Sequence, residues 1–224
     1  MEILDIFFNV SVMQRAFPIL LRGLTNTIVL GLTAIFFGGI LGVLVCLVRL
    51  YAPKPLRLLA VAYIDLLRAI PILVVLILVY YALPFAGITL SSFVAAAVAL
   101  SMVLAAYSAE VVRAGIEAVP KGQFEAATAL GLSFPRTMQK VILPQALRIV
   151  IPPLASYSVS IFKDTSLASV VAMNDLLKQA TDAQALFANP TPLILAAVFY
   201  IVLLWPLVRF TSRLEERFKQ AYGR

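Results

Sequence analysis

The chain has 224 residues, of which 62% are hydrophobic and only 13% are charged, with a net charge of +7. A soluble domain averages about 45–50% apolar and about 25% charged residues. The composition therefore excludes a water-soluble fold and predicts an integral membrane protein. Because the chain lacks histidine and has a single cysteine, Cys46, histidine-dependent catalysis, an internal disulfide and a thiolate metal cluster are also excluded. We expect no metal site.

Long apolar runs locate the membrane-spanning helices, since a span needs about 20 apolar residues. Residues 23–48 and 183–208 contain no charge, and the charge-free run 69–109 is too long for one span and is interrupted near 83–87. A shorter apolar run begins at residue 149. The predicted fold is all-α with five transmembrane helices, at about 19–49, 57–83, 89–114, 146–171 and 190–210.

Basic residues predict the orientation of these helices. The connecting segments on one side, with the C-terminal tail, hold 13 Lys and Arg against 4 Asp and Glu, whereas those on the other side hold 3 against 4. The positive-inside rule places the first set in the cytoplasm. We therefore expect an extracytoplasmic tail at 1–18 and a cytoplasmic tail at 211–224. The basic residues would contact membrane lipid headgroups, and we expect no nucleic-acid partner.

The longest cytoplasmic segment contains a short predicted helix. It runs through Glu125, Ala126 and Ala127 and ends near Gly131, where glycine can adopt the left-handed geometry that closes a helix. Pro135 can then open a second helical piece. A helix this short is not stable alone in water, so another surface has to dock against it. An amphipathic helix on lipid headgroups is one reading, but the small side chains favour contact with another protein.

The spacing in this segment resembles a family signature. Glu125, Ala126, Ala127 and Gly131 are followed, after nine residues, by an aliphatic residue, any residue, Leu143 and Pro144. This pattern resembles that of the membrane subunits of ABC-type import systems, with valine at 141 where isoleucine is usual. Three further segments, 68–71, 109–116 and 163–167, are similar to the polar amino-acid branch, the His/Glu/Gln/Arg-type permeases.

The resemblance covers residues 19–210 and implies a type-I ABC importer transmembrane domain, with 121–137 as the coupling helix. It implies a permease subunit of an ATP-driven, binding-protein-dependent importer for polar amino acids, in the inner membrane of a prokaryote. The chain has no G-x-x-x-x-G-K-[ST] loop. ATP and Mg²⁺ would therefore be bound by a separate cytoplasmic ABC ATPase dimer, so this chain would not be an enzyme and would hold no cofactor. A second identical or homologous permease subunit and an extracytoplasmic solute-binding protein would complete the system.

Charged residues inside predicted spans are costly and usually face a bundle interior or a water-filled cavity. Asp65 and Arg68 have the i, i+3 spacing of a helical ion pair, and we expect them to pair, with Arg68 also a candidate for solute contact or gating. Glu110 and Arg113 have the same spacing. For Glu110 the sequence leaves packing and solute contact open.

Lys163 and Asp164 are the strongest candidates for solute contact or gating. They are adjacent, hence about 100° apart around a helix, and are poorly placed to pair with each other. Tyr107 could add a hydroxyl group or a cation–π face, although a core aromatic is the simpler reading. Pro152-Pro153 predicts a bend in the fourth span, which fits a packing kink as well as a hinge in the pathway.

Two other function classes stay open. An ion-coupled secondary amino-acid carrier would also need charges within the membrane, but it would need no coupling helix. A lipid-modifying intramembrane enzyme would need clustered carboxylates or histidines, whereas Asp65, Glu110 and Asp164 fall on three different predicted helices. Gly38 and Gly42 form a small-xxx-small pair, for which we expect a role in helix packing.

Overall fold

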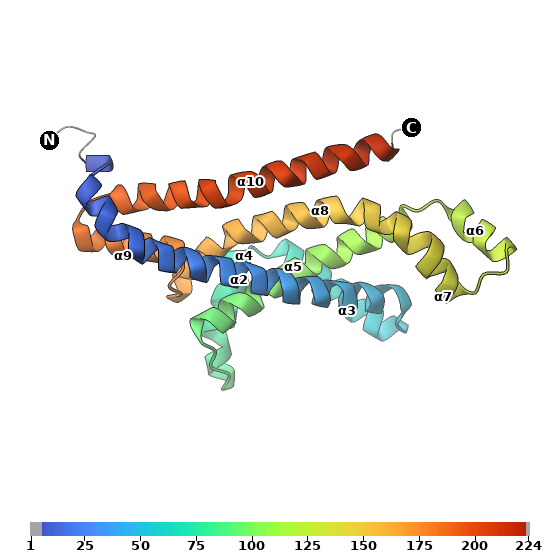
Figure 1. Cartoon of the computed structure of the whole chain (residues 1–224). Coiled ribbons are helices and arrows are strands. Elements are labelled where there is room, and N and C mark those ends of the chain that lie inside the picture. Colours follow the sequence, from blue (N-terminus) through green and yellow to red (C-terminus); the bar gives the residue numbers. More distant parts are fainter. Residues whose placement is uncertain (1–5, 223–224) are drawn as a thin grey trace.

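The computed structural model describes residues 6–222, with side chains up to residue 218, and every regular element in that part of the chain is a helix (Figure 1). The ends of both expected tails, 1–5 and 223–224, lie outside the described residues. The body contains three helices that are long and apolar enough to cross a membrane. They are α2 (Val10–Tyr51), α5 (Ser92–Glu117) and α10 (Thr191–Tyr222). The expected all-helical membrane fold is confirmed.

Helices α2 and α5 pack closely because glycine lines their contact. A Cβ atom built on Gly42 would lie 2.5 Å from Cβ of Ser108, and one on Gly38 would lie 2.9 Å from Cβ of Leu104. Neither space admits a side chain. The expectation that these two glycines serve helix packing is confirmed.

Helix α2 is longer than the span expected at 19–49. The side chain of Asn9 caps it by accepting a hydrogen bond from the backbone N–H of Val12 at 3.1 Å, and the helix continues through Pro18 to Tyr51. Residues 10–18 of the expected N-terminal tail therefore belong to this helix.

The second expected span, 57–83, is not one helix. Helix α3 (Lys54–Ala69) ends before Pro71, and the chain bends by 109° between it and the segment that begins at Ile72. Proline has no N–H to donate and disfavours the helical conformation of the residue before it, and Ile70 is accordingly extended, with φ −87° and ψ 132°. The expectation of a single continuous span is wrong.

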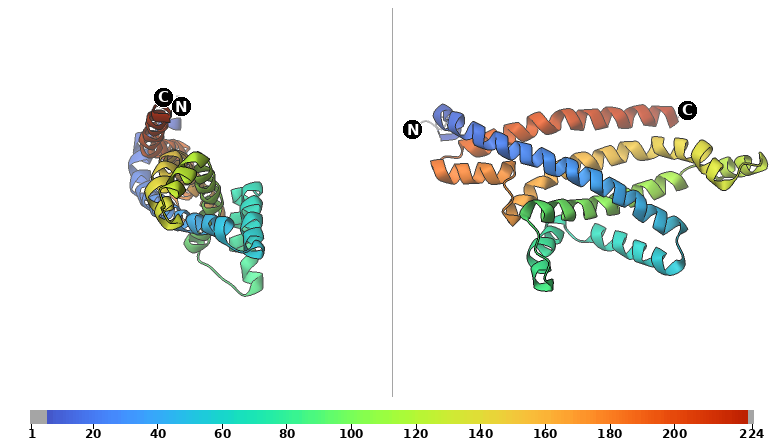
Figure 2. Two further views of the ribbon diagram at one scale, coloured as in Figure 1. Left: turned by 90° about the vertical axis from the view of Figure 1, so that its right-hand side faces the viewer. Right: turned by 60° about the horizontal axis from the view of Figure 1, so that its bottom comes forward.

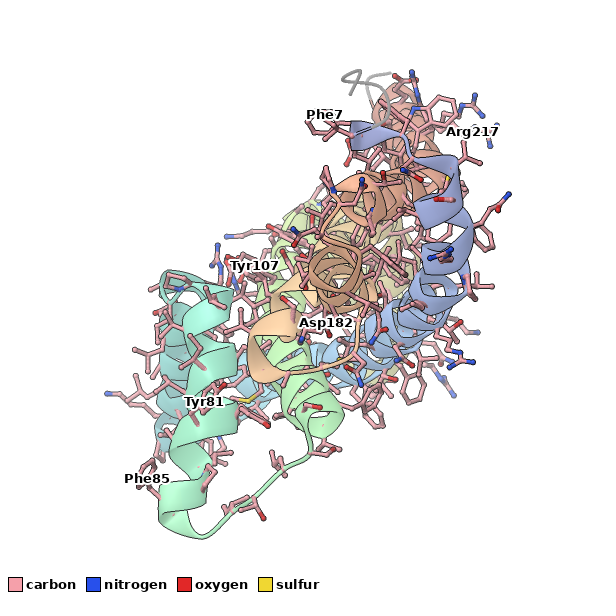
Figure 3. All side chains as sticks on the ribbon, turned by 90° about the vertical axis from the view of Figure 1, so that its left-hand side faces the viewer. Phe7, Tyr81, Phe85, Tyr107, Asp182 and Arg217 are labelled. Atoms are coloured by element: carbon pink, nitrogen blue, oxygen red, sulfur yellow. The ribbon has the colours of Figure 1, made fainter. Side chains whose placement is uncertain are left out.

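Beyond this bend, the chain forms an arm whose first part packs against α5 and whose tip projects from the body (Figure 2). The arm comprises α4 (Ile72–Ile77), a π-helical turn η1 (Leu78–Ala82) and a 3₁₀ turn η2 (Leu83–Ala86). It ends at Gly87, whose φ of +80° is left-handed, so the expected interruption near 83–87 is confirmed. Phe85 lies at the tip of the arm and is 96% exposed (Figure 3).

The fourth expected span, 146–171, consists of α8 (Leu143–Asp164) and a 3₁₀ helix η4 (Thr165–Val171). It is not among the helices apolar enough to be a candidate span, because prolines, serines and charged residues interrupt its apolar sequence. Within the described residues there are three candidate spans, or four when the bent α3–α4 pair is counted as one. The fold thus supports fewer spans than the five expected.

A further helix, α9 (Leu176–Phe187), was not expected from the sequence and lies beside the first turns of α2 and α10 (Figure 1). The opposite end of the body carries the last turns of α10 together with three short elements (Figure 2). These are α6 (Lys121–Ala129), α7 (Phe134–Thr137) and a π-helical turn η3 (Met138–Ile142). Helix α10 begins and ends at opposite ends of the body, and most of the tail expected at 211–224 is helical.

Candidate functional site

The segment around Gly131 folds as the sequence predicts. Helix α6 ends in a pair of hydrogen bonds, from Leu132 N–H to the Ala127 carbonyl at 3.0 Å and from Gly131 N–H to the Thr128 carbonyl at 2.9 Å. Gly131 has φ +72°. This pairing is the Schellman closure, which needs a left-handed residue at its turn. The predicted helix end is confirmed, and Pro135 opens α7 as expected.

One face of α6 is anchored and the other is free. Ala127 is buried, and Phe124 packs against a small core formed by Val119, Ile142 and Ala146. On the outer side Glu125 and Ala126 are exposed. Leu130 is 80% exposed. The outer side of α6 thus presents one large apolar side chain beside small residues.

Two contacts and the continuous chain fix this protruding segment to the membrane helices. The ring of Phe134 in α7 meets the ring of Tyr51, at the end of α2, edge to face with centroids 5.9 Å apart. The side chain of Gln145 donates to the side chain of Gln123 at 3.3 Å. Leu143 and Pro144 form the first turn of α8, directly after η3. The signature residues therefore build one unit that joins α6 to α8.

An ion network ties α2 to α5 near the same end of the molecule. Both carboxylate oxygens of Glu110 are engaged, one by Arg49 of α2 at 2.6 Å and the other by Arg113. Arg113 also pairs with Glu117. The sequence indicated the Glu110–Arg113 pair but not the partner from α2, because spacing along one helix says nothing about a residue 61 positions away. The geometry favours packing over solute contact for Glu110.

Arg68 does not pair with Asp65. Among the described residues no ion pair joins them, and both side chains are exposed. The guanidinium of Arg68 instead lies over the ring of Tyr107, 5.6 Å from its centroid. The expected pairing is wrong because α3 carries Arg68 towards α5, where an aromatic face is available.

Tyr107 and Asp164 share a cavity of about 210 Å³ between α5 and α8. The rings of Tyr107 and Tyr157 both line this cavity and contact each other, with their centroids 4.9 Å apart. Ser160 also lines it, and its hydroxyl donates to the Ser156 carbonyl at 3.2 Å. The other lining residues are Val103, Leu104 and Ile161. Figure 3 shows Tyr107 on the side of α5 that faces the α3–α4 segment, from which Arg68 approaches.

Lys163 is exposed and does not line this cavity. The structure thus separates the two adjacent charges, as their 100° offset requires. Sequence reasoning missed Tyr157 and Ser160. Their spacing before Asp164, at i−7 and i−4, places all three on one face of a helix and could have identified them.

Between residues 6 and 218, no three His, Cys, Asp or Glu side chains gather closely enough to hold a metal ion. The chemistry of the site is that of hydroxyl groups, one carboxylate and a nearby guanidinium. Such groups bind a polar solute by hydrogen bonds and charge.

Comparison with known proteins gives matches that cover most of the chain. Residues 34–220 match the profile of the family described as binding-protein-dependent transport system inner membrane component. The chain is 38% identical over 219 residues to the probable glutamine ABC transporter permease protein GlnM of Bacillus subtilis, covering 96% of this chain and 100% of the relative. It is 33% identical to the arginine transport system permease protein ArtQ of the same organism, covering 96% and 99%.

Solved structures match the fold. The crystal structure of an amino acid ABC transporter with histidines aligns with a TM-score of 0.86 at 34% identity, covering 92% of this chain and 96% of that one. An inward-facing structure of the MetNI methionine ABC transporter aligns with a TM-score of 0.72 at 22% identity, covering 89% and 96%, and shares the fold.

Proposed function

This chain belongs to the family of binding-protein-dependent transport system inner membrane components, and from that premise we propose that it forms half of the translocation pathway of an ATP-driven importer for polar amino acids. As a member of this family it is a multi-pass inner membrane permease, a transport component without catalytic activity of its own. ATP is handled by a partner ATPase.

The observation that carries the proposal is the closed and exposed end of α6. Its fixed Schellman turn and the 80% exposed Leu130 present a rigid apolar surface beyond the membrane helices. We place the ATPase dimer against this surface, with Glu125, Ala126 and Ala127 on the coupling helix. The contacts of Phe134 and Gln145 would pass its motion to α2 and α8. A secondary carrier, the alternative left open by the sequence, has no use for such a surface.

We further propose five spans, with the broken α3–α4 pair as the second and α8 with η4 as the fourth. Helix α8 lies between α5 and α10, so these neighbours would shield the half-buried Ser156 and Asp164 from lipid. With an odd number of spans, the start of α2 and the end of α10 would lie on opposite sides of the membrane, and we propose that α9 and the start of α2 lie outside the cell and α6 with the end of α10 in the cytoplasm. The basic residues support this orientation.

We place the solute at the cavity that Tyr107, Tyr157, Ser160 and Asp164 share. The relatives are named for glutamine, arginine and cystine, whose common chemistry is an α-ammonium and an α-carboxylate group. The Asp164 carboxylate would accept from the ammonium group, and Arg68, beside the same aromatic pair, would approach the carboxylate. A second permease subunit would complete the pathway, and Lys163, on the open side of α8, is a gating candidate there.

The test is uptake by membranes that contain this chain with its ATPase and binding protein. Asp164→Asn keeps the shape of the side chain but removes its charge, so we expect uptake to fall at least about tenfold, since a charged hydrogen bond is worth about 1.5–3 kcal/mol. ATPase association should be unchanged. Asp182→Asn, which removes an exposed carboxylate on α9, is the matched control and should transport normally. Normal uptake by Asp164→Asn would refute the cavity as the solute site.

A further inference from the structure

A second cavity, of about 470 Å³, lies between α8 and α10 and is separate from the proposed solute site. Its size is within the range of about 300–1,000 Å³ that holds small ligands. In Figure 1 these two helices run beside each other towards the end that carries α6. The lining residues are Ala118, Arg148, Ile149, Pro152, Pro153, Glu215 and Phe218.

The two prolines remove two backbone hydrogen-bond donors from the helix wall of this cavity. In a helix each carbonyl accepts from the N–H four residues later, but Pro152 and Pro153 have no N–H. The carbonyl groups of Arg148 and Ile149 therefore lack their normal donors. All four residues line the cavity. A ligand with several N–H donors would satisfy acceptors that the helix cannot.

Two opposite charges face the same cavity without pairing. Glu215 is partly buried and accepts a hydrogen bond from the Ser156 hydroxyl at 2.7 Å. Arg148 is exposed and makes no ion pair or hydrogen bond with any described side chain. Its guanidinium group lies more than 4.0 Å from the Glu215 carboxylate, too far for an ion pair. A carboxylate and a guanidinium that share a cavity in this way match a ligand carrying both an ammonium group and an anion.

The cavity lies at the cytoplasmic end of the proposed fourth span, because Arg148 and the two prolines belong to the first three turns of α8 (Leu143–Asp164). Phe218 and Ile149 supply the apolar part of the lining, which suits acyl chains.

We propose that this cavity binds a phospholipid of the cytoplasmic leaflet whose headgroup carries a primary ammonium, that is, phosphatidylethanolamine. Its ammonium group donates to Glu215 and to the carbonyl groups freed by the prolines, and its phosphate pairs with Arg148. Phosphatidylcholine has the same charges but no N–H donors. Phosphatidylglycerol has no cation, and Glu215 repels it. This inference goes beyond the transport function.

The test is lipid binding to the purified complex of this chain with its partner subunits, measured by native mass spectrometry after delipidation. Phosphatidylethanolamine, phosphatidylcholine and phosphatidylglycerol with identical acyl chains are added in turn. We expect phosphatidylethanolamine to bind at least about tenfold more tightly than phosphatidylcholine, which corresponds to one charged hydrogen bond. Equal binding of these two lipids, or tighter binding of phosphatidylglycerol, would overturn the proposal.

Two variants locate the site. Glu215→Gln keeps an acceptor for Ser156, so the helix contact survives, but it should abolish the preference for phosphatidylethanolamine over phosphatidylcholine. Arg148→Gln should weaken both lipids. Glu216→Gln, an exposed neighbour that does not line the cavity, is the matched control and should retain the wild-type preference.

A preference that survives Glu215→Gln would contradict the assignment. A cysteine at position 149, on a Cys46-free background, that cross-links to the second permease subunit would also contradict it, because the cavity would then be filled by protein. Neither measurement depends on uptake, so a failure of the lipid proposal can be distinguished from a failure of the proposed transport function.

Discussion

Replacing Gly131 by alanine and by arginine separates what this residue does within the chain from what it does for a partner. Gly131 has φ +72°, and a Cβ atom built on it meets nothing within 4 Å. The only cost within the chain is therefore the left-handed backbone, about 1 kcal/mol for any residue with a Cβ. Alanine and arginine should weaken the end of α6 equally.

Any excess effect of arginine must then come from the docked partner. We expect Gly131→Ala to reduce uptake and Gly131→Arg to abolish it, with both proteins inserted in the membrane at wild-type levels. The assay is affinity purification of the complex, followed by ATP hydrolysis with and without the loaded binding protein. With Gly131→Arg, hydrolysis should no longer respond to the binding protein, or the ATPase should be lost from the complex.

Gly87 provides the matched control. It has φ +80° with nothing within 4 Å of a built Cβ, so Gly87→Arg carries the same backbone cost on the arm, at a distance from α6. It should leave ATPase association intact. Thr128→Ala should also be mild, because the Thr128 hydroxyl only returns a hydrogen bond to the Phe124 carbonyl. Normal transport and normal ATPase stimulation with Gly131→Arg would refute α6 as the docking surface.

Three further predictions follow from packing, charge and topology. Gly42→Leu should destabilise the contact of α2 with α5 by about 1–3 kcal/mol or more, because a Cβ atom there lies 2.5 Å from that of Ser108. The Tm of the purified complex should fall, and an unchanged Tm would contradict the packing. Asp175, the cap of α9 outside the membrane spans, is fully buried, and burial raises its pKa to about 6 from 3.8. Between these two pKa values the folded state binds more protons than the unfolded state, so the free energy of unfolding falls by about 3 kcal/mol as the pH rises from about 4 to about 6. Asp175→Asn should remove this fall from a profile of Tm against pH. A profile that the variant leaves unchanged would refute Asp175 as its cause. On a Cys46-free background, a cysteine at 178 should be labelled from outside and one at 121 only from inside, and labelling of both from one side would refute the orientation.

The fold of the segment from α6 to α7 can be predicted from the sequence because its determinants are local. A helix that stops at Gly131 depends on the left-handed freedom of one glycine, and the two hydrogen bonds that close it join residues within five positions. Pro135 likewise acts on its own turn. Patterns of this kind can be read from neighbouring residues without knowledge of the tertiary fold.

The bend at Pro71 shows where apolar length misleads. The run around it is apolar enough for a continuous span, and only the absence of the Pro71 N–H and the extended conformation of Ile70 divide it. Proline within a membrane helix commonly gives a kink, so the sequence indicates a perturbation but does not give its angle of 109°. That angle depends on how α4 packs against α5.

The residues of the cavity that we propose for the solute could be predicted only in part. Tyr107 and Asp164 were identified as single residues, but their meeting depends on the crossing of α5 and α8. Arg68 contacts Tyr107 instead of Asp65, and Glu110 pairs with Arg49. Both of these contacts likewise join different helices. Spacing along one helix predicts partners within that helix but not contacts between helices.

Uptake by proteoliposomes would show directly whether this chain is part of an ATP-driven importer. The complex of this chain with its ATPase and second subunit would be reconstituted with the binding protein and a panel of radiolabelled polar amino acids. We expect uptake of at least one of them that requires ATP on the side of the membrane that carries the ATPase and the binding protein on the opposite side, and that continues when ion gradients are dissipated. Uptake driven by an ion gradient without ATP would contradict it.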